Sequence, residues 1–267
     1  MSQNLAREIR ANAIGMVARA KAAHIGGALS MADMLAVLYA DILRVRPDDP
    51  GWPERDRFIL SKGHSCTALY SALALRGFFP LEELATYGAD GSRLMAHVSH
   101  KVPGVEFSTG SLGHGLPFGC GKALAAKRRS AAWRVFVMLS DGELDEGSNW
   151  EAILFAPQHR LDNLVAMVDY NRIQSLGSVA EVLELDPLAD KFRAFRWAVR
   201  EVDGHDHEAI RAALSTAPWE AGKPSVLIAR TVKGKGVDFM ENNLQWHYSS
   251  PKPDQLASAL AQLGCKP

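Results

Sequence analysis

The stretch RVFVMLSDGELDEGSNWEAILFAPQHRLDNLVAMVDYNRI, residues 134–173, decides the fold. It opens with the apolar run at residues 134–139 and ends with a second apolar run that starts at Leu164. Neither run shows the polar alternation of a half-exposed strand, and a helix is predicted between them from about residue 146 to 158. Two apolar strands joined by a helix within about 30 residues are typical of a parallel sheet with both faces covered.

Further strands and helices follow the same plan on both sides of this stretch. Short apolar runs predict strands at residues 58–60, 197–204 and 225–232. Apolar side chains at helical spacing predict helices at residues 4–21, 66–76 and 206–214. We therefore predict a doubly wound α/β fold with a mostly parallel sheet and helices on both faces, forming one domain over residues 1–267.

Three helix boundaries are predicted from residues with strong backbone preferences. Ser30 is expected to cap a helix, with Asp33 three residues later in the place of a capping-box acid. Gly77 is expected to end the helix that starts at Cys66. The glycine-rich run GSLGHGLPFGCG at residues 110–121 is expected to form a loop that an alanine-rich helix follows.

The composition excludes several classes of function. The chain has 267 residues, 47% of them hydrophobic, which is enough for a sizeable core. Lys and Arg total 30, as do Asp and Glu, so the net charge is zero and no basic face for nucleic acid is expected. The three cysteines are far apart in the sequence, which argues against a disulfide framework or a zinc site.

The sequence also bears on location. Its first residues alternate charged and apolar side chains and lack the apolar stretch of a signal peptide. No run approaches the roughly 18 apolar residues of a membrane span. We expect a cytoplasmic protein without a membrane contact.

Polar side chains follow both strands of the central stretch. Asp141 and Gly142 come directly after the first strand, and Asn171 comes directly after the second. Since ligands bind at the carboxyl ends of parallel strands, Asp141, Asn171 and the carbonyl of Ile173 are expected near one Mg²⁺ ion. Asp141-Gly142 or Asn171-Arg172 alone would be read as an ordinary turn. The two dipeptides together, at the ends of neighbouring strands, favour a metal site.

These residues carry a resemblance to a known family. Asp141-Gly142 followed thirty residues later by Asn171 resembles the fingerprint of thiamine diphosphate enzymes. The wider text SDGELDEGSNWEA with DYNRIQSLG resembles transketolase, over about residues 10–250 and its N-terminal, diphosphate-binding domain. The resemblance implies thiamine diphosphate, Mg²⁺ (replaceable by Ca²⁺ or Mn²⁺) and contact of Gly142 with the diphosphate. Ser140 departs from the family, which usually has Gly there.

The resemblance extends to several histidines. SKGHS places Lys62 and His64 at the cofactor diphosphate, with His64 also near substrate, and AHIGG supplies His24, although Ile25 replaces the usual Pro. In LMAHVSHKVPG both His97 and His100 are candidates, and His97 is preferred because it lies six residues before Pro103. Imidazoles titrate near neutrality, so a cleft of histidines suits proton transfer on a sugar.

Two glycine-containing segments complete the expected cofactor site. GSLGHG resembles the family's loop beside the aminopyrimidine, which implies contacts from Gly110, Ser111 and Leu112, with His114 where Gln is common. TVKGKG followed by WH implies that Lys233 binds the diphosphate and that His247 faces the diphosphate or the substrate. Tyr248 stands where Gly often follows this His, and Lys235 is a solvated neighbour.

The resemblance also implies a partner. Glu146 would sit at a contact between subunits and hydrogen-bond the carboxyl that protonates the aminopyrimidine. That carboxyl and the pyrimidine pocket belong to a second transketolase domain, for which this chain has no sequence. We expect a separate C-terminal transketolase subunit in an α₂β₂ heterotetramer with a homodimer contact; a piece of a longer protein is the alternative.

The predicted activity is transfer of a two-carbon ketol unit from a ketose to an aldose, as phosphates or as unusual sulfonated or branched sugars. Two other functions compete with it. The α component of a 2-oxo acid dehydrogenase shares the metal-diphosphate motif, but it lacks the SKGH, GSLGHG and KGKG…WH segments. A non-catalytic cofactor-binding subunit would not need histidines at positions 24, 64, 97 and 247.

Overall fold

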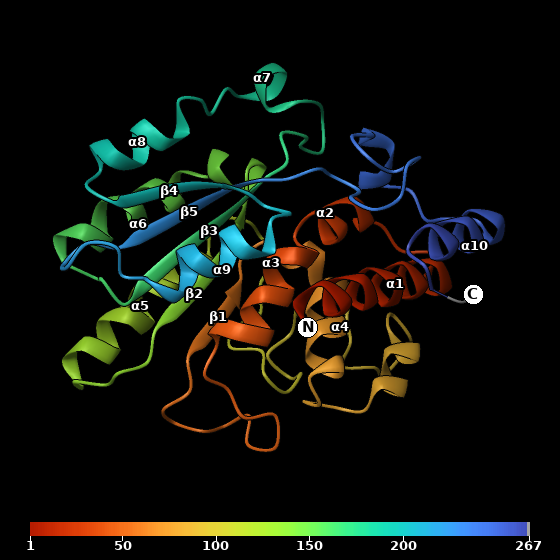
Figure 1. Cartoon of the computed structure of the whole chain (residues 1–267), viewed down its shortest axis with the longest axis horizontal. Coiled ribbons are helices and arrows are strands. Elements are labelled where there is room, and N and C mark those ends of the chain that lie inside the picture. Colours follow the sequence, from red (N-terminus) through yellow and green to blue (C-terminus); the bar gives the residue numbers. More distant parts are fainter. Residues whose placement is uncertain (266–267) are drawn as a thin grey trace.

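The computed structural model describes residues 1–265 and contains a five-stranded sheet in the order β1-β2-β3-β5-β4 (Figure 1). Every neighbouring pair of strands is parallel. The strands are β1 (Arg57–Leu60), β2 (Val135–Ser140), β3 (Leu164–Tyr170), β4 (Ala198–Asp203) and β5 (Ser225–Arg230). The predicted mostly parallel α/β sheet is confirmed, with strand boundaries within two residues of those expected.

Successive strand residues point to opposite faces of the sheet, and apolar residues occupy both faces. Helices therefore cover both faces. In β2, Phe136 and Met138 belong to one apolar cluster, whereas Val135 and Val137 belong to the other. The first cluster includes residues of α1 (Ser2–Ala20), α2 (Ile25–Ser30), α3 (Ala32–Val37), α4 (Cys66–Leu75), α9 (His207–Ser215) and α10 (Pro253–Gln262). The second includes residues of α5 (Gly115–Arg128), α6 (Gly147–Gln158), α7 (Val179–Val182) and α8 (Leu188–Ala194).

Two predicted helix boundaries are wrong. Ser30 does not cap a helix, because it lies at the end of α2 and its hydroxyl hydrogen-bonds Asp169, while Asp33 pairs with Arg10. The helix after the glycine-rich run starts at Gly115, inside the run, because Gly115 packs against Ser61 where a Cβ would clash. The predicted end of α4 is confirmed, since Gly77 has a φ of +84°.

The carboxyl ends of four strands meet along one edge of the sheet. Register pairs Leu60 with Met138, Ser140 with Asp169 and Tyr170 with Arg230, so these strands end nearly level. The loops after β2 and β3 at this edge carry Asp141 and Asn171, as predicted, and the loops after β1 and β5 carry the SKGHS and TVKGKG segments. Within residues 1–265, none of the helices combines the length and apolar character that a membrane crossing needs.

Candidate active site

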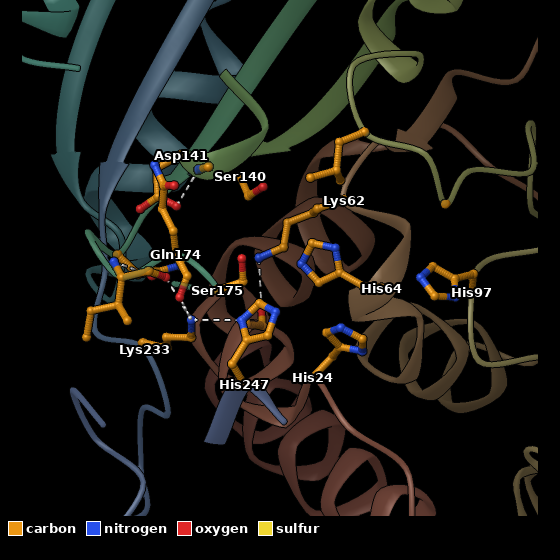
Figure 2. A pocket seen from close by; sticks show the side chains of 16 residues that line it. His24, Lys62, His64, His97, Ser140, Asp141, Gln174, Ser175, Lys233 and His247 are labelled. Atoms are coloured by element: carbon orange, nitrogen blue, oxygen red, sulfur yellow. Dashed lines mark hydrogen bonds between the residues drawn. The ribbon is translucent and has the colours of Figure 1, made fainter. Parts of the chain in front are cut away.

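A pocket opens at this edge of the sheet and contains most of the predicted site residues (Figure 2). Its predicted members are His24, Lys62, His64, His97, Gly110, Leu112, Asp141, Gly142, Asn171, Ile173, Lys233 and His247. Gly27, Ser140, Gln174 and Ser175 also line it. Of these four, only Ser140 had been noted from the sequence, as a family departure. Ser111 and Glu146 do not line the pocket formed by this chain.

Asp141 forms the acidic end of the pocket. Its side chain is 2% exposed and accepts hydrogen bonds from the backbone N–H groups of Arg172 at 2.6 Å and Gly142 at 2.8 Å. Burial, together with the neighbouring carboxylate of Asp169, raises the pKa of Asp141 to about 7. Within residues 1–265, no cationic side chain forms an ion pair with Asp141, and the nearby ammonium of Lys62 pairs with Asp169 instead.

The donors around Asp141 suit a magnesium ion that also binds phosphate. Asn171 brings an amide oxygen and Ile173 a backbone carbonyl to the same end of the pocket. Over residues 1–265, no three His, Cys, Asp or Glu side chains form a metal-binding group. A site with one carboxylate, one amide and one carbonyl leaves positions for phosphate oxygens and water, as Mg²⁺ usually requires.

Lys62 lines the pocket and forms a buried ion pair with Asp169 that the sequence did not reveal. Its ammonium donates to Asp169 at 2.5 Å and to the carbonyl of Gly27 at 3.0 Å, and Lys62 is 1% exposed. Asp169 also accepts hydrogen bonds from Ser30 at 2.6 Å and from Thr231. Burial acts to raise the pKa of Asp169, but Lys62, Ser30 and Thr231 together lower it. Asp169 therefore joins α2, the loop after β1 and the loop after β5.

Lys233 reaches the pocket from the loop after β5. Its ammonium donates to the carbonyls of Ile173 at 2.7 Å and Gln174 at 3.2 Å, and it lies 3.2 Å from Nδ1 of His247. Burial lowers the pKa of Lys233 to about 8. The carbonyl of Ile173 therefore accepts one hydrogen bond here, and its second lone pair is the one that could bind a metal ion.

Four histidines gather at the other end of the pocket (Figure 2). The ring of His24 lies 5.0 Å from that of His247, 5.2 Å from that of His64 and 5.9 Å from that of His97. Burial and the neighbouring charges of His97 and Lys233 lower the pKa of His24 to about 4. Burial and Lys233 lower the pKa of His247 to about 3, and burial and Lys62 lower that of His64.

The two histidines of the segment LMAHVSH occupy different places. His97 lines the pocket and meets His24 edge to face. His100 lies outside the pocket lining, exposed, with its Nδ1 2.7 Å from the hydroxyl of Ser108. The structure therefore places His97 on the pocket wall and His100 outside it.

The glycine-rich loop is fastened by a buried acid that the sequence analysis did not single out. Glu143 accepts hydrogen bonds from Ser61 and from the N–H of Gly113 at 2.9 Å, and it is fully buried. Burial raises the pKa of Glu143 although these donors act against the shift. Glu143 thus ties the loop before α5 to the loops after β1 and β2, which brings Leu112 to the pocket wall.

Glu146 sits at the start of α6, outside this pocket. It is the N-cap residue, is exposed, and its side chain makes no capping hydrogen bond. A Cβ on Gly113 would lie 2.8 Å from Cβ of Glu146, so the glycine loop packs directly against this residue. Within residues 1–265, its carboxylate has no ion-pair partner, and it is open to solvent.

The two ends of the pocket select the charge of a ligand. At the acidic end, a cation would stabilise the carboxylate of Asp141. Lys233, which lies between the carbonyl of Ile173 and the ring of His247, and the imidazole N–H groups beyond it can donate hydrogen bonds to an anion. A cation bound to an anionic group satisfies both. The fold and pocket thus define a parallel α/β protein with a polar pocket at its strand ends, where such proteins bind their ligands.

Comparison with known proteins gives the family. Residues 1–267 match the family model described as "Transketolase, thiamine diphosphate binding domain". The chain therefore belongs to the transketolase family. It is 41% identical over 262 residues to the 6-deoxy-6-sulfo-D-fructose transketolase subunit of a Clostridium species, covering 98% of this chain and 95% of that subunit. It is 43% identical over 254 residues to an apulose-4-phosphate transketolase subunit of Phocaeicola vulgatus, covering 95% and 90%.

Solved structures agree with this assignment. The fold matches transketolase from Leishmania mexicana with a TM-score of 0.95 and 30% identity. The match covers 100% of this chain but 42% of that enzyme. The chain therefore corresponds to less than half of a full-length transketolase.

Proposed function

We propose that this chain is the N-terminal subunit of a two-component transketolase and binds the Mg²⁺-diphosphate end of thiamine diphosphate. One observation carries the proposal. The same pocket contains the buried carboxylate of Asp141, which has no ion-pair partner among residues 1–265, and a group of lysine and imidazole side chains. In a metal-bound diphosphate, the metal ion would meet the carboxylate of Asp141 and the phosphate oxygens would meet the lysine and imidazole side chains. Family membership supplies the identity of the organic part of the ligand.

Each end has its own proposed ligands. Asp141, Asn171 and the carbonyl of Ile173 would hold the metal, and Ca²⁺ or Mn²⁺ could replace Mg²⁺. The diphosphate would lie against Gly142 and the donors of Lys62, His64, Lys233 and His247. Gly110, Ser111 and Leu112 would face the aminopyrimidine.

Bound thiamine diphosphate supplies a nucleophilic thiazolium carbon for carbon–carbon bond cleavage and formation. The protein's part is to orient the sugar and move its protons. His24, His64, His97 and His247 are the proposed acids and bases, because imidazole nitrogens can accept and donate protons at the hydroxyl groups of a sugar. The reaction moves a two-carbon ketol unit from a ketose to an aldose.

A C-terminal subunit is the proposed partner, and two relatives support it by being named as transketolase subunits. We propose an α₂β₂ assembly in the cytoplasm, in which the exposed Glu146 meets a carboxyl of the neighbouring subunit. We propose that residues of the partner subunit determine which donor and acceptor sugars the enzyme uses. Sulfonated and branched sugars are candidates because related subunits belong to transketolases named for 6-deoxy-6-sulfo-D-fructose and apulose 4-phosphate.

Two experiments test the proposal. Ketol transfer should require this chain together with the pyrimidine-binding subunit; full activity of the chain alone would overturn the two-component assembly. Calorimetric titration with thiamine diphosphate and Mg²⁺ should detect binding that Asp141→Ala abolishes. Unchanged affinity in Asp141→Ala would remove Asp141 from the site, and cofactor binding without transfer by the full assembly would favour a non-catalytic subunit.

A further inference from the structure

Each of the three residues 231–233, which carry Lys233 into the pocket, forms hydrogen bonds with another part of the protein. The hydroxyl of Thr231 donates to Asp169, and its backbone N–H donates to the carbonyl of Tyr170 at 3.2 Å. The backbone carbonyl of Lys233 accepts from Asn242 at 2.9 Å. Between these two residues, the backbone N–H of Val232 donates to a side chain, Nε2 of His205, at 2.9 Å.

This hydrogen bond defines the state of the His205 ring. A backbone N–H can only donate, so Nε2 of His205 must be the nitrogen without a proton. The proton of the neutral ring is then on Nδ1, which lies 2.6 Å from Oδ2 of Asp33 and donates to it. The ring thus connects a carboxylate of α3 to the backbone one residue before Lys233.

Asp33 is itself held firmly. Arg10 donates to both of its oxygens, at 2.5 and 3.1 Å, and Nε2 of His207 lies 3.0 Å from Oδ1. Asp33 and Arg10 are buried. Burial acts to raise the pKa of Asp33, but His205, His207 and Arg10 keep it well below its usual range. A carboxylate with fixed charge and fixed geometry gives the His205 ring only one orientation.

We infer that His205 is a positioning residue for Lys233: anchored by Asp33, it fixes the backbone at Val232 so that the lysine ammonium points into the pocket. The inference rests on the proposed role of Lys233 in diphosphate binding. His205 does not line the pocket, so it acts through the loop and not by touching the ligand. Removal of the hydrogen bonds that orient a metal ligand commonly changes affinity or activity by roughly 10- to 100-fold, and we expect the lower end of this range for a lysine oriented through its backbone.

Two substitutions separate the two hydrogen bonds of the ring. His205→Gln places an amide oxygen near the position of Nε2 and can still accept from Val232. His205→Asn places an amide N–H near the position of Nδ1 and can still donate to Asp33, but it offers Val232 no acceptor. The probe is inorganic diphosphate with Mg²⁺, titrated calorimetrically into the full chain below the unfolding midpoint of each variant.

The expected result is a roughly 10-fold weaker diphosphate affinity for His205→Asn and an affinity within about threefold of the original chain for His205→Gln. On a Lys233→Met background, His205→Asn should cause no further loss. Equal affinities of His205→Asn and the original chain would overturn the inference, as would a 10-fold loss that persists without Lys233. Absence of diphosphate binding by the original chain would instead overturn the proposed function on which the inference rests.

Discussion

The two ends of the pocket are built in different ways. At the acidic end, Asp141, Asn171 and Ile173 follow directly from neighbouring parallel strands, and backbone N–H groups hold the carboxylate of Asp141. At the histidine end, the rings come from the N-cap of α2, the loops after β1 and before α5, and a short turn near residue 247. His24 and His247 are joined there by a backbone hydrogen bond of 2.8 Å.

Because of this difference, we expect the two ends to contribute differently to the stability of the fold and to catalysis. The sheet fixes the acidic end, and its buried charges are part of how the protein folds. The histidine end depends on loops and on contacts between rings, and within residues 1–265 His247 is the one of these four histidines whose ring has a side-chain hydrogen-bond partner, Lys233. Substitutions at the first end are therefore expected to change the free energy of unfolding, and substitutions at the second to change mainly activity and pH dependence.

The largest effect is expected where the buried ion pair supports the acidic end. Lys62→Met would leave the carboxylate of Asp169 buried without its partner and should lower the free energy of unfolding by about 3 kcal/mol. Urea unfolding at neutral pH measures this loss. Lys235→Met is the matched control, because its ammonium is partly exposed and 3.6 Å from Glu241, and should cost less than about 1 kcal/mol.

The same pair gives a second measurement. Adding Asp169→Asn to Lys62→Met removes the unpaired charge and should recover part of the lost stability. Equal losses in Lys62→Met and Lys235→Met would mean that the acidic end does not depend on this ion pair, and the distinction between the two ends would fail.

Asp141→Asn should have opposite effects on binding and on stability. Loss of the metal carboxylate should weaken Mg²⁺-dependent diphosphate binding by roughly 100-fold. The ligand-free protein should become more stable by about 2 kcal/mol at pH 8, because the charge of a buried carboxylate without a cation is removed. The measurements are calorimetry and urea unfolding in the absence of divalent ions.

The pH dependence of that gain has a definite sign. Since the folded pKa of Asp141, about 7, lies above its ordinary value of 3.8, the folded protein binds more protons than the unfolded chain between these values. The original chain therefore loses stability as the pH rises through this window, and Asp141→Asn does not. A gain that is equally large at pH 4 and pH 8 would show that it does not arise from the carboxylate.

At the histidine end, His97 and His100 form a natural comparison within one loop. His97→Ala should lower ketol transfer by the complete assembly roughly 100-fold, as expected for a group that assists proton transfer. His100→Ala should stay within about twofold, because its ring faces Ser108 outside the pocket lining. Steady-state rates at saturating cofactor measure both, and unfolding midpoints should hardly differ. Equal losses would remove His97 from the chemistry.

The same contrast explains what the sequence could predict. Asp141 and Asn171 were predictable because each follows an apolar strand, and strand ends of a parallel sheet meet at one edge. The histidines were identified by resemblance, since nothing in their local spacing brings residues 24, 64, 97 and 247 together. Loop conformation and long-range packing place those rings, and neither has a periodic signal in sequence.

The residues that were missed are buried polar groups whose role depends on a distant partner. Asp169 reads as the last polar residue of a strand, and its partner Lys62 lies 107 positions away. Ser30 suggested a helix cap by its neighbours, but a buried carboxylate from β3 competes for the same hydroxyl. Glu143 cannot be told from Asp145 or Glu146 in the sequence, because only the packing of the glycine loop decides which acid points inward.

The smallest expected effect concerns His24, whose backbone has a φ of +70°. Asn tolerates this conformation, so His24→Asn removes the imidazole with little backbone strain. Burial, with His97 and Lys233, lowers the folded pKa of His24 to about 4 from the ordinary 6.5, so the unfolded chain binds more protons between these values. The stability of the original chain should therefore fall as the pH drops from 6.5 to 4, and His24→Asn should make this fall shallower. Urea midpoints across this range measure the slope, with His100→Asn as the control; an unchanged slope in His24→Asn would mean that His24 is not held neutral by the cluster.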